Sequence, residues 1–425
     1  MKILPYLIKV SVVVLVLPCL LYAIDNPHFW RATNFLTEFY EPRLERAWLT
    51  SFESTLGFGS TRKARNGQDE TVPLLDIYDT YNMQLLGVNV PNKNPADPGT
   101  IVLDQLALLP TNDGFAHFSY DGKFGICEAN LSFSQNFDYG FFMQAHVPIR
   151  RIKITDITQT DLSPLAGNPN RNNPTWQSFL TLFPHILNTY QLSIGPVSKT
   201  GIGDLSILTG WTKNYENTEE IDFIDATIRF GLLVPTGKRK NENLVFDLPL
   251  GYNGHYAVQG SFDAAIGWYD WLTIGGHFGA MVFFKRTQLI RLKTAQGQSG
   301  LIMLALDKAN VRPGAILEAN SYIKADHVIL GFSLLVGYNF AMQNSSLIEP
   351  VTPLFFNPVI LNSNEQFSAW KMHTINFGLD WDFTDYNKPN LPHMGIFYNL
   401  IVGGKRIFTT NMASFETGLY FCWQF

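Results

Sequence analysis

Residues 415–425 read Phe-Glu-Thr-Gly-Leu-Tyr-Phe-Cys-Trp-Gln-Phe, with large apolar side chains at nearly every second position. Phe415, Leu419, Phe421, Trp423 and Phe425 fall on one face if the segment is extended, and a mixture of polar and small residues falls on the other. Successive side chains of a β-strand point to opposite faces. The segment therefore predicts a strand with one apolar face and one mixed face.

The same period of two recurs along most of the chain and predicts about twelve strands, with about 14 as the alternative. The expected strands lie near 47–60, 124–135, 140–155, 201–215, 221–235, 256–268, 272–286, 312–324, 328–342, 369–383, 394–407 and 412–425. Their connections alternate in length. Short ones are expected at 136–139, 216–220, 269–271, 325–327 and 386–392, and long ones near 61–123, 156–200, 236–255, 287–311 and 343–368, while the last hairpin at 409–411 is short.

Composition narrows the fold class to two alternatives. The 425 residues are 46% hydrophobic, 14% aromatic and only 16% charged, whereas about 25% charged residues are usual in a soluble protein. Beyond the N-terminus no apolar run has the roughly 18 residues of a membrane helix. A soluble all-β protein and a membrane barrel both fit, but only the barrel explains why short and long connections alternate. We therefore predict an all-β, transmembrane, antiparallel up-and-down β-barrel with short periplasmic turns and long extracellular loops.

The N-terminus predicts export from the cytoplasm. Lys2 and Lys9 are followed by a nearly continuous apolar stretch at 10–21, which is the length of a signal-peptide core. We expect a signal peptide at 1–23 with cleavage after Ala23, although lipoprotein processing at Cys19 is an alternative. Residues 24–46 are then a periplasmic arm or a plug, and 47–425 the outer-membrane barrel.

Two short motifs carry a family resemblance. Phe421, Trp423 and Phe425 resemble the C-terminal signal that the barrel-assembly machinery reads, with the usual glycine displaced to Gly418. Gly-Ile-Gly-Asp-Leu-Ser at 201–206 and Phe-Gly-Leu-Leu-Val-Pro-Thr-Gly at 230–237 resemble the phenol-degradation meta-pathway outer-membrane proteins, which are relatives of the fatty-acid channels. This resemblance covers roughly 200–425, and it implies passive uptake of small molecules, hydrophobic ones among them.

Ionisable residues on the mixed faces are the candidate pore-lining groups. They are Glu53, Glu128, His146, Asp204, Asp225, Arg229, Asp263, His277, Glu318, Asp380, Lys405 and Glu416. In a barrel of about twelve strands the lumen is narrow, so these groups either filter solutes or form ion pairs that fill the lumen and stiffen the wall.

An apolar run inside the long connection at 156–200 is the candidate ligand-binding loop. Its candidate contacts are Phe179, Leu180, Leu182, Phe183 and Ile186. The run predicts a short helix kinked near Pro184. Exposed apolar loop segments often bind ligands, and packing against neighbouring loops is the alternative.

These features together predict a monomeric outer-membrane channel for passive uptake of small molecules. A structural or surface barrel without transport is the alternative, and an outer-membrane enzyme a further one. The nine histidines stand in no recognisable catalytic motif, so we expect no catalytic residues, no metal ion and no cofactor. A net charge of −5 gives no reason to expect nucleic acid as a partner. The expected partners are outer-membrane lipid, the barrel-assembly machinery and a small solute.

Overall fold

A computed structural model describes residues 48–110, 115–163, 172–216, 221–269, 271–329, 331–382 and 392–422. The expected signal peptide at 1–23 and the expected arm or plug at 24–46 lie outside the described residues. So do Trp423 and Phe425 of the expected assembly signal.

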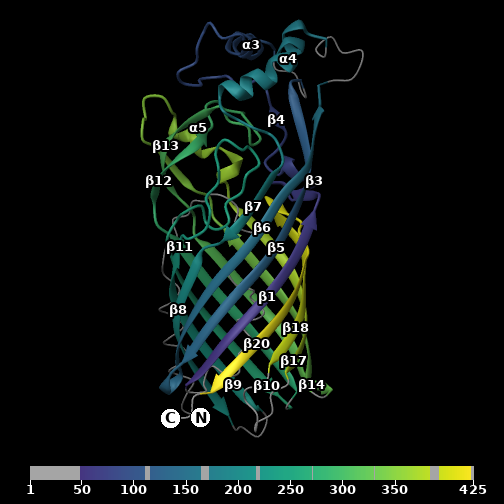
Figure 1. Cartoon of the computed structure of the whole chain (residues 1–425), viewed down its shortest axis with the longest axis vertical. Coiled ribbons are helices and arrows are strands. Elements are labelled where there is room, and N and C mark those ends of the chain that lie inside the picture. Colours follow the sequence, from purple (N-terminus) through teal and green to yellow (C-terminus); the bar gives the residue numbers. More distant parts are fainter. Residues whose placement is uncertain are drawn as a thin grey trace.

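Twelve antiparallel strands form a closed barrel, as the sequence predicts (Figure 1). They are β1 (Leu49–Thr61), β5 (His117–Asn136), β6 (Phe141–Asp161), β8 (Leu205–Glu216), β9 (Phe223–Val234), β10 (Ala257–Trp268), β11 (Leu272–Phe283), β14 (Ile316–Ile329), β15 (Phe332–Gln343), β17 (Trp370–Asp382), β18 (His393–Lys405) and β20 (Met412–Cys422). Their order round the ring is β1-β20-β18-β17-β15-β14-β11-β10-β9-β8-β6-β5, and pairing of β5 with β1 closes it. Two short strands, β4 (Tyr81–Asn82) and β7 (Val197–Ile202), extend the same sheet.

Exposure alternates along the barrel strands and separates an outer from an inner face. On β1, the outward-facing Phe52, Leu56 and Phe58 are exposed, whereas the inward-facing Ser51 and Thr55 are buried. A closed ring pairs the backbone amides of every strand with both neighbours, which hydrocarbon requires. The apolar outer surface and the closed ring make the chain an outer-membrane barrel. Among the described residues, no helix is long and apolar enough to cross a membrane.

The two ends of the barrel differ in their connections, again as predicted. At one end the connections are short, as at η3 (Asp138–Gly140) between β5 and β6, and β11 begins at Leu272 soon after β10 ends at Trp268. The turn expected at 325–327 is displaced, because a register shift after Ala325 lets β14 continue to Ile329. The short connections at 217–220 and 383–391 lie outside the described residues. By the rule for such barrels, the end with tight turns is periplasmic.

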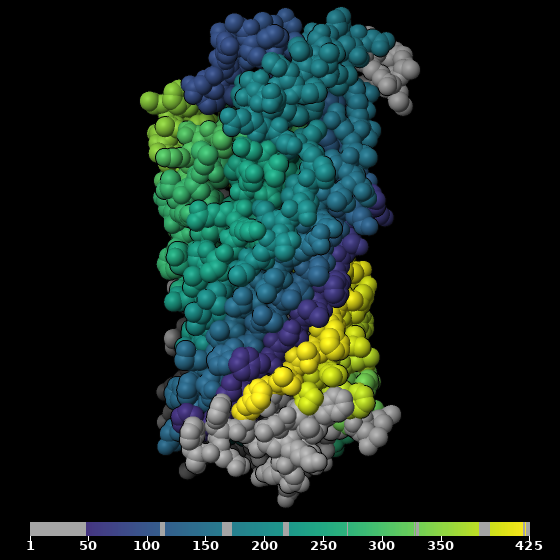
Figure 2. Space-filling view, in the orientation of Figure 1, coloured from purple at the N-terminus to yellow at the C-terminus, as the bar shows by residue number. Residues whose placement is uncertain are grey.

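The long connections at the other end fold together into a cap that covers the barrel (Figures 1 and 2). The cap contains α3 (Pro98–Ala107), α4 (Pro174–Thr189), α5 (Pro358–Asn362), η2 (Leu74–Asp76) and η4 (Glu365–Phe367). It also contains β2 (Lys63–Arg65), β3 (Thr71–Pro73) and β19 (Ile407–Phe408), which form one small sheet, and β12 (Arg286–Leu292), β13 (Ala305–Arg312) and β16 (Leu347–Pro350), which form another.

One hydrophobic core runs through the cap and into the upper barrel. It joins inward-facing strand residues, such as Phe124 and Ile154, with residues from the connections, such as Leu75 and Phe246. The upper end of the lumen is therefore filled by packed apolar side chains. Sequence periodicity does not predict this packing, because the core joins residues that are far apart in the chain.

Helix α4 is the helix predicted from the apolar run, and it begins earlier than expected. Asn173 caps its first turn by accepting a hydrogen bond from the Thr175 amide (2.8 Å), and Pro184 lies within it. Its apolar face packs on the raised end of β5, where the Phe118 and Phe183 ring centroids are 5.6 Å apart. Trp176 is fully buried and donates a hydrogen bond from Nε1 to Asp161 (3.1 Å).

Replacing Trp176 with Ala tests whether α4 is held by this packing. Truncation of a fully buried Trp costs about 3–5 kcal/mol, so α4 should detach from the cap while the barrel stays closed. We expect proteolysis within 174–189 to accelerate by roughly tenfold or more, with unchanged heat-modifiable mobility on gels. Leu108→Ala, at a side chain that is 85% exposed, is the matched control and should cleave at the wild-type rate.

Candidate functional site

Ten of the twelve predicted pore-lining residues lie on the inward face of barrel strands, where the sequence placed them. These are Glu53, Glu128, His146, Asp225, Arg229, Asp263, His277, Glu318, Asp380 and Glu416. The alternation of exposed and buried residues along each strand shows that these side chains point inward. Their part in solute passage remains a prediction.

Lys405 is placed on the opposite face from the one predicted. Ile401 and Gly403 pair with adjacent residues of β17, so Val402 between them is an extra residue and forms a β-bulge. One extra residue reverses the facing of every residue beyond it. Lys405 therefore lies on the outer surface, directly opposite Lys371.

Asp204 lies between β7 and β8 and is not part of the strand wall. Its carboxylate accepts hydrogen bonds from the backbone amides of Gly237 (2.8 Å) and Tyr252 (2.6 Å). These amides belong to the connection between β9 and β10, residues 235–256, which we call the mouth loop. Asp204 is 1% exposed and serves to fix the mouth loop.

Two cations hold the mouth loop from the barrel side. Arg150, on the inner face of β6, forms an ion pair with Glu128 and donates a hydrogen bond to the Leu250 carbonyl (3.0 Å). Lys199 forms an ion pair with Asp247 (2.5 Å) and donates to the Leu248 carbonyl (2.9 Å). Together with Asp204, these contacts secure the loop between the cap and the lumen.

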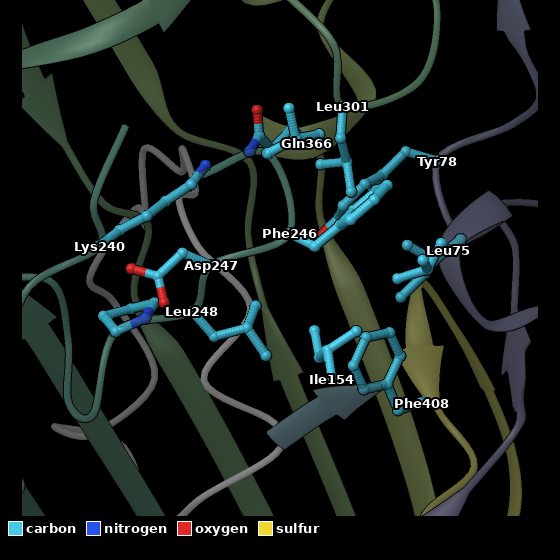
Figure 3. A pocket seen from close by; sticks show the side chains of 13 residues that line it. Leu75, Tyr78, Ile154, Lys240, Phe246, Asp247, Leu248, Leu301, Gln366 and Phe408 are labelled. Carbon is cyan, nitrogen blue, oxygen red and sulfur yellow. The ribbon is translucent and has the colours of Figure 1, made fainter. Parts of the chain in front are cut away.

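A pocket lies between the mouth loop and the rest of the cap (Figure 3). The empty space amounts to about 500 Å³, part of it open to solvent. Its lining residues come from six separate segments and are mostly apolar: Leu75, Ile77, Tyr78, Ile154, Lys240, Val245, Phe246, Asp247, Leu248, Pro249, Leu301, Gln366 and Phe408. Ile154 is also an inward-facing residue of β6, so the pocket adjoins the barrel interior.

The five residues predicted to bind ligand do not line this pocket. Phe179, Phe183 and Ile186 are buried in the cap core, and Leu180 and Leu182 are partly buried against it. Packing against neighbouring loops, the alternative considered from the sequence, describes their position. The pocket residues at 245–249 read Val-Phe-Asp-Leu-Pro, and this second apolar run within a long connection was the signal that sequence reasoning missed.

One titratable group beside the pocket has a strongly altered pKa. Asp76 follows Leu75 and is 4% exposed. Burial raises the pKa of its carboxyl to about 6, although hydrogen bonds from the Ser119 hydroxyl and the Tyr120 amide (2.8 Å) act in the opposite direction. Protonation of Asp76 is thus coupled to the position of the segment that carries Leu75, Ile77 and Tyr78.

The raised pKa makes cap stability depend on pH in a definite direction. The folded-state value lies above the unfolded value of 3.8, so folding favours the protonated form. The stabilisation is complete below the unfolded value and is lost as pH rises through about 6. We expect the cap melting temperature to fall between pH 5 and pH 7.5 in the wild type, and to fall less in Asp76→Asn. Equal pH profiles for the two proteins would contradict this assignment.

Two of the charged networks among the described lumen residues lie on opposite walls. Asp263 forms ion pairs with Arg229 and with His277 Nδ1 (2.6 Å), linking β9, β10 and β11. Glu416 accepts hydrogen bonds from Thr55 (3.1 Å) and His393 Nε2 (3.2 Å), linking β1, β20 and β18. Five strands separate β10 from β20 in either direction round the ring. These contacts join neighbouring strands along each wall.

Replacing Asp263 tests how much the first network stabilises the folded barrel. Asp263→Asn leaves the Arg229 guanidinium, whose side chain is 2% exposed, without its buried counter-charge. Loss of one partner of a buried pair costs about 3–5 kcal/mol. We expect a destabilisation of that order in urea unfolding from vesicles, with part of the loss recovered by adding Arg229→Gln. Additive effects of the two substitutions would show that the pair is not coupled.

The lumen wall from β14 to β20 also carries uncharged polar groups. Asn320 on β14, Asn339 on β15 and Thr374 on β17 lie directly opposite one another on three successive strands. Each has a buried side-chain polar atom without a hydrogen-bond partner among the described residues, as do Asn399 on β18 and Ser414 on β20. We call these five residues the polar row. Buried polar groups in proteins are normally satisfied by protein or by water, so the polar row is a part of the lumen wall with spare hydrogen-bonding capacity.

The described residues contain no group of three or more His, Cys, Asp or Glu side chains that could hold a metal ion.

Comparison with known proteins gives structural likeness but no sequence relative. No protein-family model matches the sequence, and no curated protein is significantly similar to it. An outer-membrane channel from Pseudomonas putida F1 matches with a TM-score of 0.46 at 10% identity, over 88% of this chain and 96% of that one.

Two further barrels are similar to a lesser degree. The toluene transporter TbuX from Ralstonia pickettii gives a TM-score of 0.33 at 9% identity, over 88% of this chain and 90% of that one. The translocator domain of the autotransporter NalP from Neisseria meningitidis gives 0.32 at 9% identity, over 91% and 94%. The type predicted from the sequence, an outer-membrane channel, is thus among the structures that this chain resembles.

Proposed function

We propose that this chain is a passive outer-membrane channel for small molecules with an apolar body. Two features of the interior support the proposal. The apolar pocket under the cap offers a first binding place, and the polar row beneath it offers hydrogen-bonding groups along the lumen wall. The observation that carries the most weight is the polar row, because its five side chains keep polar atoms without a partner among the described residues, and these atoms are available to a solute or to water in the lumen.

The mouth loop is the element that must move for a solute to pass. It supplies Val245, Phe246 and Leu248 to the pocket, and it lies above the lumen held by Asp204, Arg150 and Lys199. All these ties are hydrogen bonds or ion pairs to a loop, and loops open at a lower free-energy cost than core strands do. A solute in the pocket would exchange with the lumen when the loop shifts.

One chain suffices for this function, because it closes its own barrel. We therefore propose that it acts as a monomer and that the barrel-assembly machinery inserts it. The exposed Phe421, on the outer face of β20, is in keeping with the predicted assembly signal.

Filling the pocket tests the proposal. Leu248→Trp adds an indole to a partly buried lining position, so it should reduce entry of an apolar probe such as toluene into liposomes containing the protein by roughly tenfold, because steric exclusion removes the binding place. Uptake is followed with a dye or an enzyme inside the liposome. Leu108→Trp, on the exposed end of α3, is the control and should transport at the wild-type rate.

Two results would sink the proposal. A wild-type protein that gives neither probe uptake nor conductance in planar bilayers would be a structural or surface barrel. Equal uptake by Leu248→Trp and the wild type would leave the channel but remove the pocket from its path.

A further inference from the structure

Cations that form no ion pair with the described residues gather on the outer surface of β5 and β6, at the end of the apolar belt that is nearest the cap. Arg151 pairs in register with Cys127, and Lys153 with Gly125, while Lys123 follows on the same outward face. We call Lys123, Arg151 and Lys153 the rim cluster. Residues two apart on a strand, and diagonal neighbours on adjacent strands, are separated by about 7 Å. The three charges thus share one small area of surface.

A second group of cations lies at the same end of β17 and β18. Lys371 and Lys405, the rim pair, stand directly opposite each other on the outer face. Like charges in this arrangement are destabilising unless an anion lies between them. The nearby Asp69 carboxylate is already engaged, because it accepts hydrogen bonds from Arg65 (2.9 Å) and from the Gly404 amide (3.2 Å).

The rim cluster begins where the apolar belt ends. On β6 the outward positions from Phe141 to Ile149 are all apolar, and Arg151 is the next. Eight residue steps cover about 27 Å along a strand, and a tilt of about 40° reduces this to about 20 Å of height. The apolar band of such barrels is about 25 Å tall. Arg151 and Lys153 therefore lie at the level of the headgroups in the outer leaflet.

The surrounding acidic groups do not neutralise these cations. Asp156 forms an ion pair with Arg62 (2.5 Å), and Asp121 lies two residues farther from the membrane than Lys123. Within the described part of the chain, no ion pair includes a residue of the rim cluster or the rim pair.

The basic character is confined to one side of the barrel. On β9, β10 and β11 the outward positions near the cap are occupied by Leu232, Val258 and Val282. Lys285, a cation in the connection that follows β11, is paired with Glu349. The rim cluster on β5 and β6 and the rim pair on β17 and β18 thus lie on the same side of the barrel, with β1 and β20 between them.

We propose that the rim cluster and the rim pair bind the phosphate groups of a phosphorylated lipid of the outer leaflet, whose acyl chains lie against the apolar belt below. Lys and Arg make charge-assisted hydrogen bonds with phosphate oxygens. An outward-facing site at headgroup height joins such contacts to burial of the lipid tails. This site is separate from the pocket and the lumen, so it is independent of the proposed transport.

The test measures how much diphosphoryl lipid A raises the melting temperature of the full chain, refolded in detergent. Lys123→Gln, Arg151→Gln and Lys153→Gln are combined in one variant. We expect the lipid concentration needed for half of the shift to rise by roughly fivefold for each cation removed. Lys285→Gln and Lys213→Gln, at the paired position and at the periplasmic rim, are the matched controls and should bind as the wild type does.

Two further probes distinguish binding of a lipid phosphate from binding of free phosphate and of the lipid tails alone. Lipid A without its phosphates should give little shift, and inorganic phosphate should give none. Equal binding of the dephosphorylated lipid would show that tail contacts alone suffice, and an equal effect of inorganic phosphate would show a site for soluble anions. Either result would overturn the proposal, as would wild-type binding by the triple variant. Heat-modifiable mobility confirms that each variant has formed its barrel.

Discussion

Pairing of every barrel strand with two neighbours is the constraint on which the rest of this structure depends. Inside hydrocarbon an unpaired backbone amide costs several kcal/mol, so the sheet must close, as β5 does with both β1 and β6. Closure fixes one face of each strand toward lipid and the other toward the lumen. Twelve strands then leave an interior narrow enough for wall residues to reach past a neighbouring strand, as Arg229 on β9 does when its Nε donates a hydrogen bond to Gln144 on β6 (3.2 Å).

The cap depends on the same ring. β5 and β6 are the longest strands, and their upper ends rise above the other strands and present Phe118 and Tyr120 to the core of the cap. The mouth loop is held from the barrel by Asp204 and Arg150. The apolar pocket therefore exists because polar groups of the barrel rim hold the loop that lines it. The barrel wall, the mouth loop and the pocket are thus linked by direct contacts, and the polar row lies on the wall nearer the periplasmic end.

The strands were predictable because period two is a local property, readable from residues such as Phe415, Leu419 and Phe421. It also placed ten candidate lumen residues on the inner face. It failed at Lys405, because the extra residue Val402 reverses the facing and leaves no mark in the alternation. The cap could not be predicted, since its core joins residues far apart in the chain. The apolar run containing Phe179 was the predicted ligand-binding segment, yet it is buried in the cap core, and the run at 245–249 lines the pocket instead.

The cap core joins residues that are widely separated in the sequence, and this separation bears on the order in which the parts of the molecule fold. Its buried residues range from Ala64 to Phe408, so no single connection can complete it. Contacts between distant parts of a chain form slowly, because loop closure opposes them. Completion of the cap therefore needs all of the long connections together. By this argument the cap forms after the wall, most of whose strands pair with their neighbours in sequence.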